Sequence, residues 1–351
     1  MEYIPMPSLS ELIQKFAEAK ERRCRQRQIT KADEARVIFW FHEACMRAGV
    51  RRPYGLEHLA KPESFGQNED GLPYHGTQFA KYQRGIHRPH RSTVDKVEAV
   101  APGSKKSIEH VLWKALSEDE KLGENATRWL RQLEPSIQSI VFKRGEDVLA
   151  LQGERFLGML ERRASLDALA ALTILTRLRL EQGHAKQAWC CALATYRVLL
   201  MLGNTFHEHG VAPRIVELYK TRIFDIVRWD DMRLDIPSSD FAEKVTALYD
   251  IGKLRAGARR EPVSWHEHVR AMREILLGKV RFDWYFWLRA LEVPDTESGP
   301  PSADTLRRSR FLQLAQDWGR HHIGTRNCDP GMPDKLFQEA VSYLPSEILK
   351  I

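Results

Sequence analysis

Side chains that can hydrogen-bond to the edges of bases gather in one short stretch of the chain. Thr77, Gln78 and Lys81 stand at positions i, i+1 and i+4, so a helix would present them on one side. Glutamine can bond adenine in a bidentate fashion, and lysine can bond guanine. These three residues are therefore the candidates for contacts to bases in duplex DNA.

Four residues with basic side chains follow directly: Arg84, His87, Arg88 and Arg91. Such side chains bind phosphate oxygens, which fix the register of a protein on a duplex, whereas contacts to bases specify the sequence. They are the candidates for phosphate contacts. A solvated basic surface is the alternative interpretation of the same residues.

The elements that would position these side chains are two short helices and a turn. Phe79 and Tyr82 lie three positions apart and can face inward as packing anchors. Gly85 suits the end of the first helix, Pro89 ends the basic turn, and Ser92 suits the cap of the second helix. The sequence thus predicts a helix, a glycine stop, a basic turn and a second helix.

This order resembles the second half of the lambda-repressor/Cro type of helix-turn-helix. In that type, the recognition helix ends in an aromatic residue, a polar pair and glycine. A basic turn with proline then leads to a helix opened by Ser or Thr. The chain reads KYQRG, IHRP and STV at the corresponding places between residues 81 and 94. The resemblance covers about residues 33–116 and implies a DNA-binding domain with residues 77–84 as its recognition helix.

The chain departs from the family pattern just before the recognition helix. Residues 56–60 are the candidate for the first helix of the motif, and residues 61–76 separate them from Thr77. The family joins these two helices by a few residues. Residues 61–75 are rich in proline, glycine and acid, and we expect a loop. The sequence leaves open whether this loop is an insertion.

Positive charge is concentrated in the same part of the chain. Residues 1–116 hold 20 Lys and Arg against 14 Asp and Glu, whereas residues 117–351 hold 34 against 33. A polyanionic partner favours such concentration, because each neutralised phosphate releases counterions. The net charge of the whole chain is only +7, so charge by itself does not establish a nucleic-acid partner.

Helical periodicity runs through nearly all of the chain, and strand-like alternation is scarce. We therefore expect an all-α fold in two domains. Residues 1–116 form a helical DNA-binding domain that a helix at about 105–116 closes. Residues 117–351 form a larger array of helical hairpins for dimerisation, partner binding or ligand binding. Residues 292–304 have the composition of a flexible linker.

Residues with catalytic or metal-binding potential are present, but their spacing argues against such chemistry. His207 and His209 flank Glu208, and His266 and His268 flank Glu267. Positions i and i+2 point to different sides of a helix, so neither triplet suits a metal, and we expect surface histidines. The aromatic run 284–287 is expected in the core. The sequence predicts no cofactor, no metal and no enzymatic activity.

The leading hypothesis is a transcriptional regulator that reads a near-palindromic operator as a homodimer. A protein or small-molecule effector could bind the second domain. Cysteines at irregular spacing without a CxxC pair favour reduced thiols and a cytoplasmic protein, and no apolar stretch is long enough to span a membrane. A helical scaffold for protein or RNA partners and a helical enzyme with a site among residues 184–290 are the alternatives.

Overall fold

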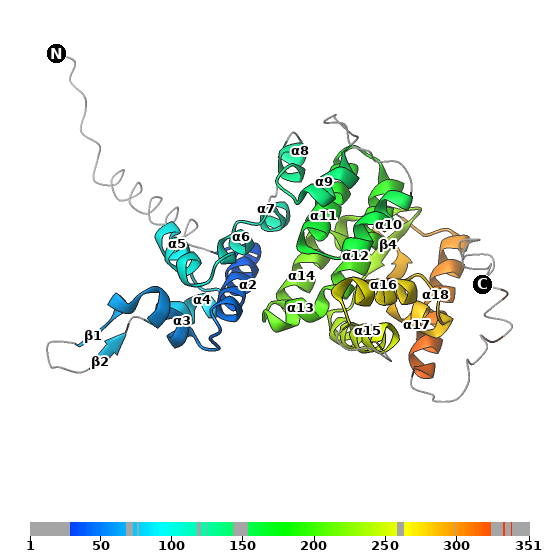
Figure 1. Ribbon diagram of the computed structural model, residues 1–351. Coiled ribbons are helices and arrows are strands. Elements are labelled where there is room, and N and C mark those ends of the chain that lie inside the picture. Colours follow the sequence, from blue (N-terminus) through cyan, green and yellow to red (C-terminus); the bar gives the residue numbers. More distant parts are fainter. Residues whose placement is uncertain are drawn as a thin grey trace, which may run out of the picture. The chain divides into compact units, whose positions relative to one another are not determined.

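A computed structural model describes most of the chain and confirms the all-α class (Figure 1). The described residues are 29–67, 73–75, 77–117, 121–123, 125–142, 154–257, 263–297, 299–323, 333 and 338. The structure is mostly helical, with 72% helix and 5% strand. The chain divides into two compact units, Met1–Ile108 and Glu109–Ile351, called unit 1 and unit 2 below.

Unit 1 is a small helical bundle with a β-hairpin. Its core contains Trp40, Phe41 and Leu56 together with Phe79 and Tyr82. The elements in chain order are α2 (Lys31–Arg47), α3 (Pro53–Ala60), the 3-10 turn η1 (Pro62–Ser64), β1 (Phe65–Gln67), β2 (Pro73–His75), α4 (Gln78–Gln83), α5 (Arg91–Val100) and α6 (Ser104–Ile108).

Helix α2 is the longest of the described elements of unit 1, and its first turn is fixed by local hydrogen bonds. The side chain of Thr30 accepts a bond from the backbone N–H of Asp33 at 3.1 Å, as expected of a good N-cap residue. Helix α2 packs against both α4 and α6. Val37, Trp40, Phe41, Ala44 and Cys45 of α2 belong to the core of unit 1, so α2 forms one wall of the core on which α4 rests.

The boundary between the units differs from the expected one. The predicted helix at 105–116 is interrupted, because α6 ends at Ile108 and α7 (Val111–Ser117) begins a new helix. Helix α7 packs against α11 (Leu166–Glu181) in unit 2. There Arg177 donates from Nη1 to the backbone oxygen of Ala115 at 2.6 Å. Burial of α7 on α11 therefore assigns it to unit 2.

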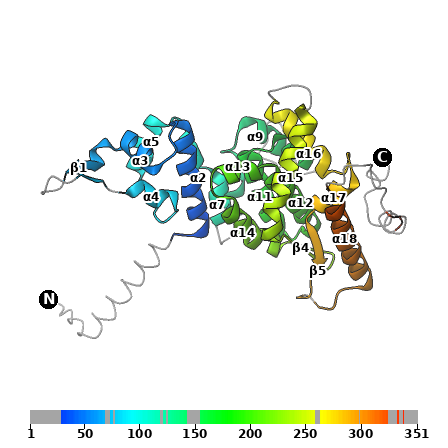
Figure 2. The same cartoon turned by 90° about the horizontal axis from the view of Figure 1, so that it is seen from below.

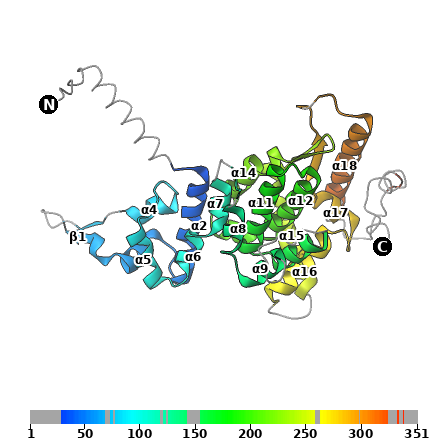
Figure 3. The same cartoon turned by 90° about the horizontal axis from the view of Figure 1, so that it is seen from above.

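Unit 2 consists of successive helices in contact with one another (Figures 2 and 3). Helix α11 pairs with α12, α15 with α16, and α17 with α18. The helices after α11 are α12 (Ala185–Met201), α13 (Gly203–Glu208), α14 (Ala212–Arg222), α15 (Ser238–Gly257), α16 (Trp265–Leu276), α17 (Phe282–Leu288) and α18 (Ala303–His322); α8 (Asn125–Leu130), α9 (Pro135–Val141) and α10 (Glu154–Arg163) precede it.

A small antiparallel sheet in unit 2 corrects the linker prediction. Strands β3 (Arg228–Trp229) and β4 (Met232–Asp235) form a hairpin, and β5 (Leu291–Pro294) adds to β4 with Arg233 opposite Val293. Glu292, which begins the predicted linker, is fully buried. Pairing with a strand almost sixty residues earlier is a tertiary effect that the composition of residues 292–304 does not reveal.

Lys244 of α15 is a buried ammonium group within unit 2. Its Nζ donates to the backbone oxygen of Arg289 at 3.3 Å, and the residue is only 4% exposed. Burial lowers the pKa of Lys244 from 10.5 to about 8. At neutral pH the fold therefore holds a charge that would be better solvated in the unfolded chain.

Replacing this lysine with methionine is expected to stabilise unit 2. Lys244→Met should raise the free energy of unfolding by about 1–3 kcal/mol at neutral pH. Gln316 also donates to the oxygen of Arg289, at 3.1 Å, so that oxygen keeps a partner. The gain should shrink as the pH rises from about 8 toward 10.5, because the lysine of the native protein then becomes neutral first. Urea denaturation of both proteins across this pH range measures the effect, and a gain that does not change with pH would contradict it.

Among the described residues, no helix is both long and apolar enough to cross a bilayer.

Candidate nucleic-acid interface

Two buried aromatic side chains attach α4 to the core of unit 1. Phe79 and Tyr82 are both fully buried, which confirms them as inward anchors. Their ring centroids lie 5.4 Å apart, and the ring of Trp40 on α2 lies 5.7 Å from that of Tyr82. Burial raises the pKa of Tyr82. Because this side of α4 is fixed against the core, the helical period determines which side chains of α4 point away from the core.

The three predicted base-contact residues lie on accessible parts of α4. Thr77 is exposed, while Gln78 and Lys81 are half-buried. The Nζ of Lys61, just after α3, donates to Oε1 of Gln78 at 3.0 Å. This bond fixes the amide of Gln78 and places a second cation beside the start of α4.

Thr77 joins the hairpin to α4 in a strained conformation. Its φ of 41° lies in the left-handed region, which a β-branched residue rarely adopts. Its side chain makes no capping hydrogen bond. The sharp turn lets the chain leave β2 and enter α4 within one or two residues.

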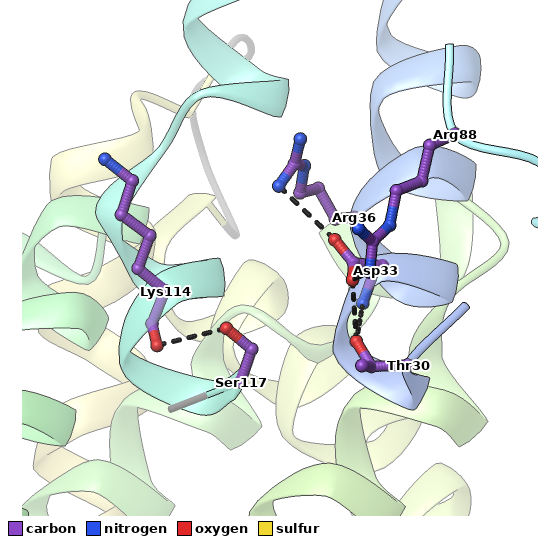
Figure 4. A network of polar contacts seen from close by, with 6 residues as sticks. All are labelled: Thr30, Asp33, Arg36, Arg88, Lys114 and Ser117. Carbon is purple, nitrogen blue, oxygen red and sulfur yellow. Dashed lines mark hydrogen bonds and ion pairs between the residues drawn. The ribbon is translucent and has the colours of Figure 1, made fainter. Parts of the chain in front are cut away.

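Arg88 differs from the other predicted phosphate-contact residues because it is already paired. Its guanidinium bonds the carboxylate of Asp33 in the first turn of α2 (Figure 4). The same carboxylate lies 3.3 Å from Nη1 of Arg36 and accepts a bond from Thr30 at 2.8 Å. The pair connects the basic turn to α2, and half of the Arg88 side chain stays exposed. A separate bond in the same view, from Ser117 to the oxygen of Lys114, closes the end of α7.

Arg84, His87 and Arg91 are exposed around the end of α4 and the start of α5. Arg84 donates from Nε to the backbone oxygen of Ala80 at 3.1 Å. Helix α5 begins at Arg91, and its N-cap is His90 without a side-chain hydrogen bond. The prediction that Ser92 caps this helix was therefore wrong, because Ser92 already lies within its first turn.

The segment predicted as a loop at 61–75 contains η1 and the antiparallel pair β1–β2, in which Phe65 lies opposite His75. The ring of Phe65 contacts Tyr54 and His58 of α3, with centroids 5.1 and 5.4 Å apart. Helices α3 and α4 nevertheless pack directly against each other. The hairpin is therefore an excursion between two helices that pack against each other.

Some basic side chains of unit 1 are neutralised and others are not. Lys96 pairs with Glu63, and Lys105 pairs with Asp95 at 2.7 Å. The hydrogen bonds from these lysines lower the pKa of Glu63 and of Asp95. Within the described part of the chain, no ion pair involves Lys81, Arg84, His87, Arg91 or the two arginines that precede α3.

Those two arginines, Arg51 and Arg52, are site candidates that the sequence reasoning missed. Both are exposed, and Pro53 follows them as the first residue of α3. Proline favours the first position of a helix, and the start of a helix carries partial positive charge. Two arginines directly before a proline that begins a helix are the sequence feature that could have identified this part of the site.

The prediction that the histidines of both triplets lie at the surface is confirmed for only one histidine of each. His207 and His266 are exposed, but His209 and His268 are buried, so the expectation of surface histidines was wrong for these two. Each gives its ring N–H to a backbone oxygen: His209 to Thr205 at 2.7 Å and His268 to Tyr249 at 2.9 Å. Within the described ranges, no cluster of His, Cys, Asp and Glu has the geometry of a metal site.

Comparisons with protein-family models, with curated proteins and with solved structures give no significant match to this chain.

Proposed function

We propose that unit 1 binds duplex DNA through α4 and that the chain is a sequence-specific transcriptional regulator in the cytoplasm. The observation that carries this proposal is the two-sided character of α4. Phe79 and Tyr82 lock one side into the core, while Thr77, Gln78 and Lys81 stay accessible on the rest of the helix. A helix held in this way can enter a major groove of DNA without any change in the core of unit 1.

The distribution of unpaired cations supports the same proposal. Lys61 lies beside the start of α4 and Lys81 lies in the last turn of α4, whereas Arg51 and Arg52 lie at the opposite end of α3 from Lys61. The eight residues of α3 span about 12 Å, which is close to the width of the B-DNA major groove. In this arrangement Gln78 and Lys81 read bases, and Arg51, Arg52, Arg84, His87 and Arg91 bind phosphates. Unit 2 supplies the homodimer contact that two half-sites need.

Selection of bound duplexes from a random pool, followed by anisotropy titrations, tests the proposal. Replacing Gln78 and Lys81 together with alanine should reduce discrimination between the selected duplex and a scrambled one by about tenfold or more. Arg91→Gln should weaken binding to both duplexes equally and reduce the salt slope by about one.

A matched control comes from unit 2. Arg310 on α18 is exposed, so Arg310→Gln removes the same charge without touching α4 and should leave both affinities nearly unchanged. Wild-type protein that binds no duplex at low salt would refute the proposal. Equal discrimination by the wild type and the double variant would refute the role of α4.

A further inference from the structure

Unit 2 contains a cavity of about 830 Å³ between α10, α12, α16 and α17. Helix α10 contacts α12 and α16, and α16 contacts α17, the next helix along the chain. The volume falls within the range of small-molecule sites. Its wall includes exposed residues such as Arg162 and Lys279, so the cavity reaches the protein surface.

The charged residues in the cavity wall are nearly all basic. One carboxylate, Glu161, lines the cavity together with six cationic side chains: Arg155, Arg162, Arg197, Arg273, Lys279 and Arg289. Arg289 has its own counter-charge in the buried Glu292, so five cations remain for the one carboxylate of the wall. Like charges repel each other in a poorly solvated cavity. A wall of this composition is therefore complementary to an anion.

Glu161 does not neutralise this wall. Its buried carboxylate binds Arg197 at 2.7 Å and Arg273 at 2.9 Å, so two cations share one negative charge. Gly158 leaves the space that the guanidinium of Arg273 occupies, since a Cβ there would lie 2.8 Å from its Nη2. Glu161 thus orients two arginines along the cavity and leaves the group with a net positive charge.

Three other cations have no such partner. Among the residues that the structure describes, no ion pair involves Arg155, Arg162 or Lys279. A second cavity of about 310 Å³ shares Arg162, Arg273 and Lys279 with the first and adds His266, Arg270 and Glu274, of which the last two pair with each other at 3.4 Å. The shared residues show that the two cavities adjoin along a cationic edge.

The remaining wall is apolar and partly aromatic. Leu157, Leu193, Leu277 and Leu288 contribute to it, and Tyr285 presents a half-buried ring. The aromatic run 284–287 was expected in the core, and this is confirmed for Trp284, Phe286 and Trp287. Tyr285 instead lines the cavity, where Arg289 donates to its hydroxyl at 3.2 Å.

We propose that this cationic cavity binds a phosphorylated small molecule that carries an apolar or aromatic group. Arg162, Lys279 and the arginines oriented by Glu161 bind the phosphates, for which guanidinium groups are well suited. The leucines and Tyr285 contact the uncharged part. This site is independent of the DNA-binding role proposed for unit 1.

Calorimetric titration of the full-length protein with ATP and with inorganic tripolyphosphate tests the proposal. Both probes should bind, ATP several-fold more tightly because it also uses the apolar wall. Removing Arg162 and Lys279 together, as Arg162→Gln with Lys279→Gln, should weaken both probes by about tenfold or more. Both side chains are exposed, so the variant should unfold at the temperature of the wild type. Arg310→Gln serves as the control for loss of charge elsewhere in unit 2.

Cys190 gives a second readout within the cavity. It is half-buried in the wall, whereas burial raises the pKa of Cys45 and of Cys191 to about 12 and keeps those thiols unreactive. ATP at ten times its Kd should slow alkylation of Cys190 by about tenfold, as measured by peptide mass spectrometry.

Three results would overturn the proposal. The first is that neither probe binds, and the second is that the double variant binds both as tightly as the wild type. The third is that a single-stranded RNA oligonucleotide protects Cys190 while ATP does not, which would assign the cavity to a polynucleotide.

Discussion

Replacing Glu292 with glutamine is expected to lower the free energy of unfolding of unit 2 by about 3 kcal/mol at neutral pH, because a buried ion pair that loses one partner is strongly destabilising. Glu292 on β5 is fully buried between Arg289, which directly follows α17, and Arg308 of α18, whose Nη2 lies 2.7 Å from the Glu292 carboxylate. Glutamine would leave both guanidinium groups without their counter-charge. Urea denaturation followed by far-UV circular dichroism measures the loss.

The pH dependence of this loss has a definite sign. Burial alone would raise the pKa of Glu292, but Arg289 and Arg308 outweigh it, and the pKa is lowered from 4.5. The carboxylate therefore stabilises the fold above about pH 4.5, and the contribution is lost as the pH falls through the lower native pKa. The difference between wild type and variant should accordingly shrink in acid.

An exposed ion pair in the same unit gives the control. Glu243 lies 3.1 Å from Arg320, and both side chains are about half exposed at 52%. Glu243→Gln should cost less than about 1 kcal/mol, as surface pairs do. If the two substitutions lower the free energy of unfolding equally, burial of the Glu292 carboxylate does not explain the stabilisation by its ion pairs.

The second large effect is expected at Gly85, the residue that ends α4. Its φ of 70° lies in the left-handed region, and a Cβ would lie 2.6 Å from Cγ and 3.0 Å from the backbone oxygen of Glu34 on α2. Gly85→Ala should therefore destabilise unit 1 by about 2–4 kcal/mol, through backbone strain and overpacking together. Binding of duplex DNA should weaken with it, because α4 can no longer rest on α2.

Gly49 separates the two causes. Its φ is nearly the same, 67°, but a Cβ there would meet nothing within 4 Å. Gly49→Ala should therefore cost only the strain, about 1 kcal/mol. Thermal unfolding of both variants gives the comparison, and equal losses would mean that close packing of Gly85 against α2 adds nothing.

Local pattern was sufficient where a residue's role depends on its near neighbours. Phe79 and Tyr82 were placed inward from their spacing, and both are buried. Gly85 was expected to stop the first helix, and α4 ends at Gln83. Helical period and the conformational freedom of glycine act over a few residues, so the sequence contains them directly.

Other features were missed because they join distant parts of the chain. The pairing of Arg88 with Asp33, which stands 55 positions earlier, was not expected. Strand β5 was expected to be a linker, and its pairing with β4 spans a similar distance. The residues next to a side chain in the sequence do not reveal whether that side chain has a partner elsewhere in the fold.

The amino-acid sequence by itself determined the helical class, the end of α4 at Gly85 and which side of α4 faces the core. Only the tertiary structure decided which basic residues are neutralised and which meet around the cavity of unit 2. Arg162, Arg197, Arg273 and Lys279 come from three helices and a turn across more than one hundred positions. Burial and charge pairing depend on distances in space, whereas helix periodicity depends on distances along the chain.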